Sequence, residues 1–134
     1  METDLIISVI NEIHKKADQA LENKDFTAYT AIFTDDLSFT PFEKPAINKR
    51  DFTIDLKKYL SGAKTIQTSH YRIKSSVEHE IFTEKIARKS VIIKPNLLIF
   101  SKKQTVQTEE VYHWKNVRGE WKVTALEIVL EEKY

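Results

Sequence analysis

Two alternating runs near the C-terminus constrain the fold of this chain more than any other feature. Between Thr108 and Val129, apolar and polar residues alternate on both sides of a short connection at Asn116–Gly119. Alternation is typical of strands that bury one face, and a glycine in a short connection is typical of a β-hairpin. Because an amphipathic helical pattern opens the chain, helices precede strands, which favours the α+β class over repeated βαβ units. This order predicts a curved sheet wrapped over helices, a shape that encloses a pocket.

The composition is that of an ordinary folded domain. A chain of 134 residues, of which 41% are hydrophobic, is long enough for one core, and no repeat or shift in composition divides it. We therefore expect a single domain over residues 1–134. The 21 basic and 20 acidic side chains give a formal net charge of +1. Since this charge creates no field that would attract nucleic acid or an anionic membrane, neither is expected as a partner.

The residue types that are missing or rare exclude several chemistries. Without cysteine there is no disulfide, thiolate ligand or cysteine nucleophile. With 2 glycines there is no glycine-rich phosphate loop, and the 4 histidines lack the i, i+4 spacing of a helical zinc pair. We therefore expect neither a cofactor nor a metal. The acidic N-terminus and the lack of an apolar run of about 20 residues favour a cytoplasmic protein without a membrane span.

Helical periodicity predicts a long first helix. It runs to about Asn23, and His14 falls at the rim of its buried stripe. The stripe includes Ile6, Val9, Ile13 and Ala17.

Capping residues predict two further helices. A short second helix begins after Asp25 and ends near Asp35–Asp36, and the strand Leu37–Thr40 follows it. A third helix is expected between Asn48, its N-cap, and Gly62, its C-terminal stop.

From residue 65 onward the period changes to two. In the first long strand, Tyr71 and Ile73 share one face, which we expect to be the buried one, while Arg72 and Lys74 share the other. A second strand covers roughly residues 84–94.

Two positions stay open for the turn after this second strand. Pro95–Asn96 has the better turn chemistry, whereas Ser101–Gln104 gives better matched strand lengths. We favour Ser101–Gln104.

Two segments carry a resemblance to a known superfamily. They are Asn23–Pro41, with the sequence NKDFTAYTAIFTDDLSFTP, and Trp114–Val123, which contains Gly119 and Trp121. Placed on either side of a helix, they resemble the nuclear transport factor 2-like superfamily. More narrowly, the chain resembles the SnoaL-like branch, which includes ketosteroid isomerase, scytalone dehydratase and hexachlorocyclohexane dehydrochlorinase. The resemblance implies a cone-shaped, mostly antiparallel sheet around the N-terminal helices.

The resemblance also implies catalytic positions. The general-base aspartate of ketosteroid isomerase falls on Thr40, whose hydroxyl is too weak an acid to replace a carboxylate, so that reaction is not expected. The motif Gln67–Tyr71 resembles the strand that carries the catalytic histidine of the dehydrochlorinase and the dehydratase. This implies His70 as a general base with Glu22 as its carboxylate partner. Strict alternation turns His70 away from the pocket, so this role requires a bulge or a sharp twist at the start of the strand, before His70.

Aromatic and acidic side chains are the candidates for a ligand pocket. In such a fold the same wall residues serve core packing and ligand contact. The candidates are Tyr29, Phe33, Phe39, Tyr59, Tyr71, Glu110, Tyr112 and Trp114. Glu110 shares a strand face with Tyr112 and Trp114, where a carboxylate needs a partner or a raised pKa.

Three functions stay open. The favoured one is a SnoaL-like domain that binds a small, mostly apolar molecule between the helices and the sheet. The second is a cofactor-independent lyase, dehydratase or isomerase with His70 as the base. The third is a non-catalytic homodimerisation or partner-binding domain, with Trp114 and Trp121 filling the cone. We also expect a homodimer through the outer sheet face, because long strands with exposed apolar positions rarely stay monomeric.

Overall fold

The computed structural model describes residues 2–95 and 101–134, in which three helices precede a long-stranded sheet. The helices are α1 (Glu2–Glu22), α2 (Phe26–Thr30) and α3 (Lys49–Ser61). The strands are β1 (Phe33–Thr40), β2 (Ile47–Asn48), β3 (Thr65–Glu78), β4 (Ile81–Pro95), β5 (Ser101–Val117) and β6 (Glu120–Lys133).

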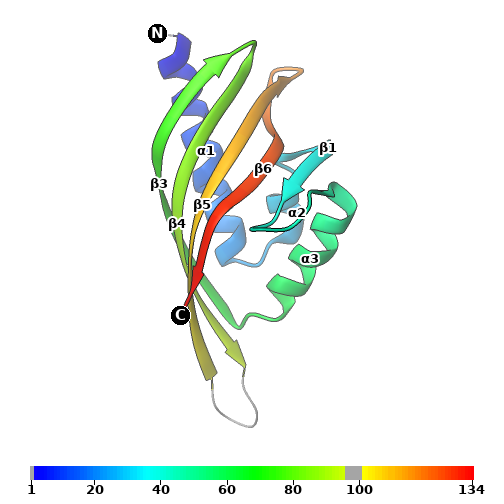
Figure 1. Ribbon diagram of the computed structural model, residues 1–134, viewed down its shortest axis with the longest axis vertical. Coiled ribbons are helices and arrows are strands. Elements are labelled where there is room, and N and C mark those ends of the chain that lie inside the picture. Colours follow the sequence, from blue (N-terminus) through cyan, green and yellow to red (C-terminus); the bar gives the residue numbers. More distant parts are fainter. Residues whose placement is uncertain (1, 96–100) are drawn as a thin grey trace.

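The strands form one curled, unclosed sheet in the order β2-β1-β6-β5-β4-β3. Only the pair β1 and β6 is parallel among the described strands, and every other pair is antiparallel. All three helices lie against one face of the sheet, which we call the inner face (Figure 1). The predicted α+β class, with a curved and mostly antiparallel sheet around N-terminal helices, is confirmed.

The predicted helix caps are confirmed. The carboxylate of Asp25 accepts a hydrogen bond from the backbone N–H of Ala28 at 3.1 Å, and the side chain of Asn48 accepts one from Asp51 at 2.9 Å. Each cap satisfies a backbone donor that the first helical turn leaves without a partner. Gly62 follows the last residue of α3, as expected.

The predicted C-terminal hairpin is also confirmed. Val117 pairs with Glu120, and the two residues between them, Arg118 and Gly119, have φ angles of 54° and 90°. Two successive positive φ values are typical of the type I′ turn, whose twist matches that of the flanking strands. The side chain of Asn116 closes the turn by accepting a hydrogen bond from the Gly119 N–H at 2.8 Å.

The second helix is shorter than predicted. It ends at Thr30, and β1 begins at Phe33 instead of Leu37. The carbonyl of Ile32 accepts a hydrogen bond from the backbone N–H of Val123 in β6 at 2.8 Å, so the chain joins the sheet at this point. This long-range pairing overrides the local helical pattern.

The buried stripe of α1 also differs from the prediction. Ile6 and Ala17 are buried as expected, but Val9 is 40% exposed, whereas His14 is only 2% exposed. The predicted stripe was defined by hydrophobic residues alone, so it placed His14 at its rim. In the structure, an acidic partner beneath α1 makes burial of this histidine favourable.

The two faces of β3 are the reverse of the prediction. Tyr71 and Ile73 are 68% and 46% exposed on the outer face, while His70 and Arg72 contact groups under α1. The pairing of β3 with β4 shifts between Arg72 and Lys74, so the β-bulge follows His70 instead of preceding it. Polar residues face inward here because α1 presents polar partners to them.

The predicted turn at Ser101–Gln104 is wrong. Ser101 pairs with Pro95 and Gln104 pairs with Ile92, so these residues belong to β5. Asn96, which the alternative position includes, lies outside the described residues.

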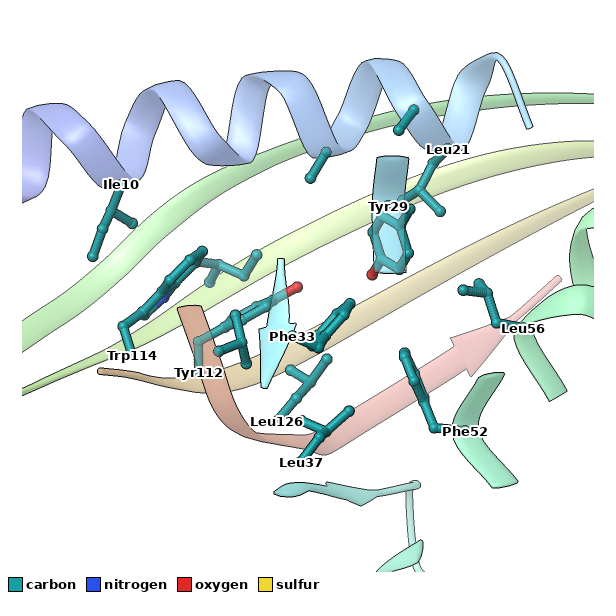
Figure 2. Close-up of a cluster of buried hydrophobic side chains, with 14 of the residues drawn as sticks. Ile10, Leu21, Tyr29, Phe33, Leu37, Phe52, Leu56, Tyr112, Trp114 and Leu126 are labelled. Carbon is teal, nitrogen blue, oxygen red and sulfur yellow. The ribbon is translucent and has the colours of Figure 1, made fainter. Parts of the chain in front are cut away.

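The core lies between the inner face and the helices (Figure 2). Phe52 and Leu56 project from α3, and Ile10 projects from α1 toward the end of the core that contains Trp114. Trp114, Phe33 and Phe82 are among the largest fully buried side chains. No helix in residues 2–95 and 101–134 is long and apolar enough to cross a membrane.

Candidate functional site

A buried carboxylate organises the space between α1 and the sheet. Glu84 is on the inner face of β4, and its side chain is fully buried. Its Oε2 accepts hydrogen bonds from His14 Nε2 and Trp114 Nε1, both at 2.6 Å, and its Oε1 accepts one from Arg72 Nε at 2.8 Å. Three donors therefore replace the water that this carboxylate loses on folding.

A buried guanidinium lies further along the same strand face. Arg88 donates to Asp18 Oδ1 at 2.8 Å and to Glu110 Oε1 at 3.1 Å. Glu110 also accepts hydrogen bonds from the hydroxyls of Tyr112 at 2.8 Å and Thr108 at 2.7 Å. The charge of Arg88 is thus shared between two carboxylates, and Glu110 has three donors of its own.

His70 connects the two groups of charges. Its Nδ1 is 2.6 Å from Asp18 Oδ2, and its ring centre is 4.8 Å from that of His14. Because Asp18 is bonded to both His70 and Arg88, one aspartate of α1 links the β3 histidine to the β4 arginine. A carboxylate in this position orients the imidazole and favours its Nδ1–H tautomer.

Burial and pairing have opposite effects on these carboxyl groups. Burial acts to raise the pKa of Asp18, but the hydrogen bond to His70 and the charge of Arg88 outweigh it, so this pKa is lowered. Burial likewise acts to raise the pKa of Glu84, and the bond to His14, together with the charges of His14 and Arg72, lowers it overall. Both groups are therefore carboxylates at neutral pH.

A cavity of about 340 Å³ lies between α2, α3 and the inner face. Most of its wall is apolar and includes Leu21, Phe39, Phe52, Leu56, Ile92, Val106, Leu126 and Ile128. Polar groups enter it from three tyrosines and from Arg88, Ser90, Lys94, Gln104, Thr108, Glu110, Glu131 and Lys133. An apolar wall with a few polar groups is the usual character of a small-molecule site.

Two of the tyrosines have free hydroxyls. Tyr29 and Tyr59 line the cavity, and neither hydroxyl forms a hydrogen bond to another described residue. Burial raises the pKa of both phenols, so they remain neutral donors. The hydroxyl of Tyr112 is instead engaged by Glu110, and burial followed by the charge of Glu110 raises its pKa well above the usual value.

The cavity contains most of the predicted ligand-binding residues. Tyr29, Phe39, Tyr59, Glu110 and Tyr112 line it.

The remaining three candidates lie elsewhere. Phe33 and Trp114 are buried in the core and do not line the cavity. Tyr71 lies on the outer face, so its predicted place in the pocket is wrong; a strand with polar partners under α1 turns its aromatic residue outward.

The predicted pair of His70 and Glu22 is not brought together. His70 faces α1 as a pocket base would, but its carboxylate partner is Asp18, one helical turn before Glu22. Glu22 is exposed, and its Oε2 accepts a hydrogen bond from the backbone N–H of Thr68 at 3.0 Å. This contact satisfies a donor on the edge strand β3. His70 does not line the cavity and reaches it only through Asp18 and Arg88.

Sequence reasoning missed Asp18, Glu84 and Arg88, although a signal was present. Along β4, the apolar residues at 82, 86 and 92 are an even number of positions apart, and Glu84 and Arg88 fall in the same phase as these residues. Charges in the buried phase of a strand require partners of opposite charge. No group of three or more His, Asp or Glu side chains in the described residues is arranged to hold a metal ion.

Acidification should destabilise the protein through Asp18 and Glu84. Because both folded-state pKa values are lowered, their contribution is complete above the usual carboxyl pKa of about 4 and is lost as the pH falls through the folded-state values. Glu84→Gln should reduce the free energy of unfolding at neutral pH by about 3 kcal/mol and flatten its decline in acid. Urea unfolding across this pH range measures both effects.

The control for this prediction is Glu78→Gln, at an exposed position of β3. It should leave stability and its pH dependence unchanged. Wild-type behaviour of Glu84→Gln would contradict the role given to the buried carboxylate.

Comparison with known proteins identifies the fold through structure alone, because the sequence matches no protein-family profile and no curated sequence. A protein from Novosphingobium aromaticivorans, proposed to be a scytalone dehydratase, superposes with a TM-score of 0.83 at 12% identity, covering 99% of this chain and 91% of that one. Hexachlorocyclohexane dehydrochlorinase LinA type 2 gives a TM-score of 0.76 at 10% identity, with coverage of 100% and 93%.

A third similar structure carries the family name. It is a proposed dehydratase of the nuclear transport factor 2-like family from Streptomyces avermitilis, with a TM-score of 0.73, 14% identity and coverage of 95% and 99%. Identities this low show the fold and not the activity. The resemblance found in the sequence is thus confirmed, and the chain has the nuclear transport factor 2-like fold.

Proposed function

We propose that this protein binds a small, mostly apolar molecule in the cavity between α2, α3 and the inner face. The observation that carries the proposal is a cavity of about 340 Å³ with an apolar wall and two free tyrosine hydroxyls. The side chain of Trp114 belongs to the core and leaves this cavity open, which favours a binding site over a filled cone.

The polar groups of the cavity define what part of a ligand would contact them. Arg88 is neutralised by Asp18 and Glu110, so it does not offer an unpaired charge. Tyr29 and Tyr59 offer neutral O–H donors beside apolar side chains. A hydroxyl, ether or carbonyl oxygen on the ligand would pair with these donors, whereas a charged group beside them would lose its water without a counter-ion.

Filling the cavity should weaken binding. Ile128 lines it from β6, and Ile128→Trp should weaken binding of the neutral fluorescent probe N-phenyl-1-naphthylamine by at least about tenfold, because the indole takes the ligand's volume. Fluorescence titration measures the affinity. The matched control is Val129→Trp, which adds the same ring at a 37% exposed neighbour and should bind as wild type. Probe binding that Ile128→Trp does not change would contradict the proposal.

A second candidate function is a cofactor-independent lyase or isomerase with His70 as the base. The observation that favours it is the 2.6 Å contact of His70 with Asp18, since an imidazole oriented by a carboxylate can remove a proton beside a leaving group. The similar structures include a dehydrochlorinase and proposed dehydratases. A substrate in the cavity would have to reach the imidazole past Arg88, which makes this function the weaker of the two.

The lyase proposal predicts turnover that depends on His70. His70→Ala should lower the rate on any accepted β-elimination or dehydration substrate by at least about 100-fold, because the base is lost, while probe binding stays near wild type. His113→Ala, on the outer face, is the control and should keep full activity. Equal rates for wild type and His70→Ala would leave only the binding function.

We also propose that the protein forms a homodimer through the outer sheet face. A groove there is lined by Tyr71, Ala87 and Leu130 together with Lys89 and Glu109. Exposed apolar side chains on a broad sheet favour association, and a two-fold pair is the commonest closed assembly. The mixed composition predicts an interface that is partly polar.

The cytoplasmic location expected from the sequence stays a prediction.

Light scattering at micromolar concentration should give twice the 15.7 kDa mass of one chain. Leu130→Lys should shift the protein to the monomer, because it places a charge in the apolar part of the interface. Leu5→Lys changes an exposed leucine on α1 and should remain dimeric. A monomer mass for the wild type would remove the dimer proposal.

A further inference from the structure

The outer end of the cavity is charged, in contrast to its interior. Lys94 of β4 and Lys133 of β6 line the cavity together with Glu131. Lys133 is 3.2 Å from Glu131, and the side chain of Lys133 is 55% exposed, so this pair lies where the cavity meets solvent. Figure 1 shows β4 and β5 extending past the helices at this end.

Lys94 is the cation without a counter-ion. It follows Ser90 and Ile92 on the inner face of β4 and is partly buried. No carboxylate lies within ion-pair distance of it among the described residues. A lysine held against an apolar cavity without a partner provides a site for an anion, because the anion would supply the missing charge.

The inner end of the cavity excludes an anion. Glu110 lines it and Asp18 lies behind Arg88, so this deep cation already faces two carboxylates. Burial is the largest cause of the raised pKa values of Tyr29 and Tyr112, and the charge of Glu110 adds to both, so a further negative charge placed beside them would lose its water. A negatively charged group is therefore tolerated only at the Lys94 end.

We infer that the cavity takes an amphipathic anion, with an apolar body against Leu56, Val106 and Leu126 and a carboxylate or similar head group at Lys94. This inference rests on the proposed binding function and names its ligand class. The polar part of the ligand faces solvent and Lys94, while its apolar part fills the space toward Tyr29. The apolar wall then binds one end of the molecule, and Lys94 binds the other.

The test compares three probes with the same ten-carbon chain and different head groups. Decanoate, decanol and decyltrimethylammonium are titrated against the full chain by displacement of N-phenyl-1-naphthylamine. Decanoate should bind at least about tenfold more tightly than decanol, and the ammonium compound most weakly. Raising the salt from about 0.05 to 1 M should reduce the preference for decanoate, because salt screens an exposed ion pair.

Lys94→Met should remove the preference while keeping the binding of decanol, since methionine retains an apolar chain and loses the charge. Lys89→Met, at an exposed position on the outer side of the same strand, is the control and should keep the preference. Equal affinities for the three wild-type complexes, or a preference that survives Lys94→Met, would overturn the inference and leave the binding function intact. If no probe binds, the binding function fails as well.

Discussion

The pairing of Glu84 and Arg88 with α1 is the constraint on which the rest of the structure depends. Both charges lie on the inner face of β4, and both find partners one helical turn apart on α1, namely His14 and Asp18. Removing one member of a buried ion pair typically costs about 3–5 kcal/mol, because the other is left without water or a partner. These contacts therefore fix both the rotation of α1 and its position along the sheet.

This polar seam divides the interior into two parts. Under α1, histidines, arginines and carboxylates are joined by hydrogen bonds and ion pairs. Under α2 and α3, apolar side chains meet the sheet with a remaining volume of about 340 Å³. Arg88 belongs to both parts, since it lines the cavity and bonds to Asp18. The charge of Arg88 is thus paired internally, whereas Lys94 at the outer end of the cavity has no carboxylate partner among the described residues.

Local patterns predicted much of the fold, and long-range pairing determined the rest. The helix caps at Asp25 and Asn48 and the turn at Gly119 depend on hydrogen bonds between residues three positions apart, so they could be inferred from the sequence. The end of α2 could not be inferred in this way, because the backbone N–H of Val123 in β6 donates a hydrogen bond to the carbonyl of Ile32 and so joins this residue to the sheet. Hydrophobicity also misassigned the face of β3, since the inward side chains there are polar. The same rule applies to the site. Five aromatic or acidic wall residues were predicted from local patterns. Asp18 and Arg88 were not, because their role depends on a contact between residues far apart in the sequence.

A crystal structure of the protein grown with decanoate tests the central claim most directly. The account predicts the acyl chain between α3 and the inner face, with the carboxylate within about 4 Å of Lys94 Nζ and the contacts of Glu84 and Arg88 to α1 unchanged. Decanoate bound in the outer-face groove, or a head group beside Arg88 in place of Asp18, would contradict it.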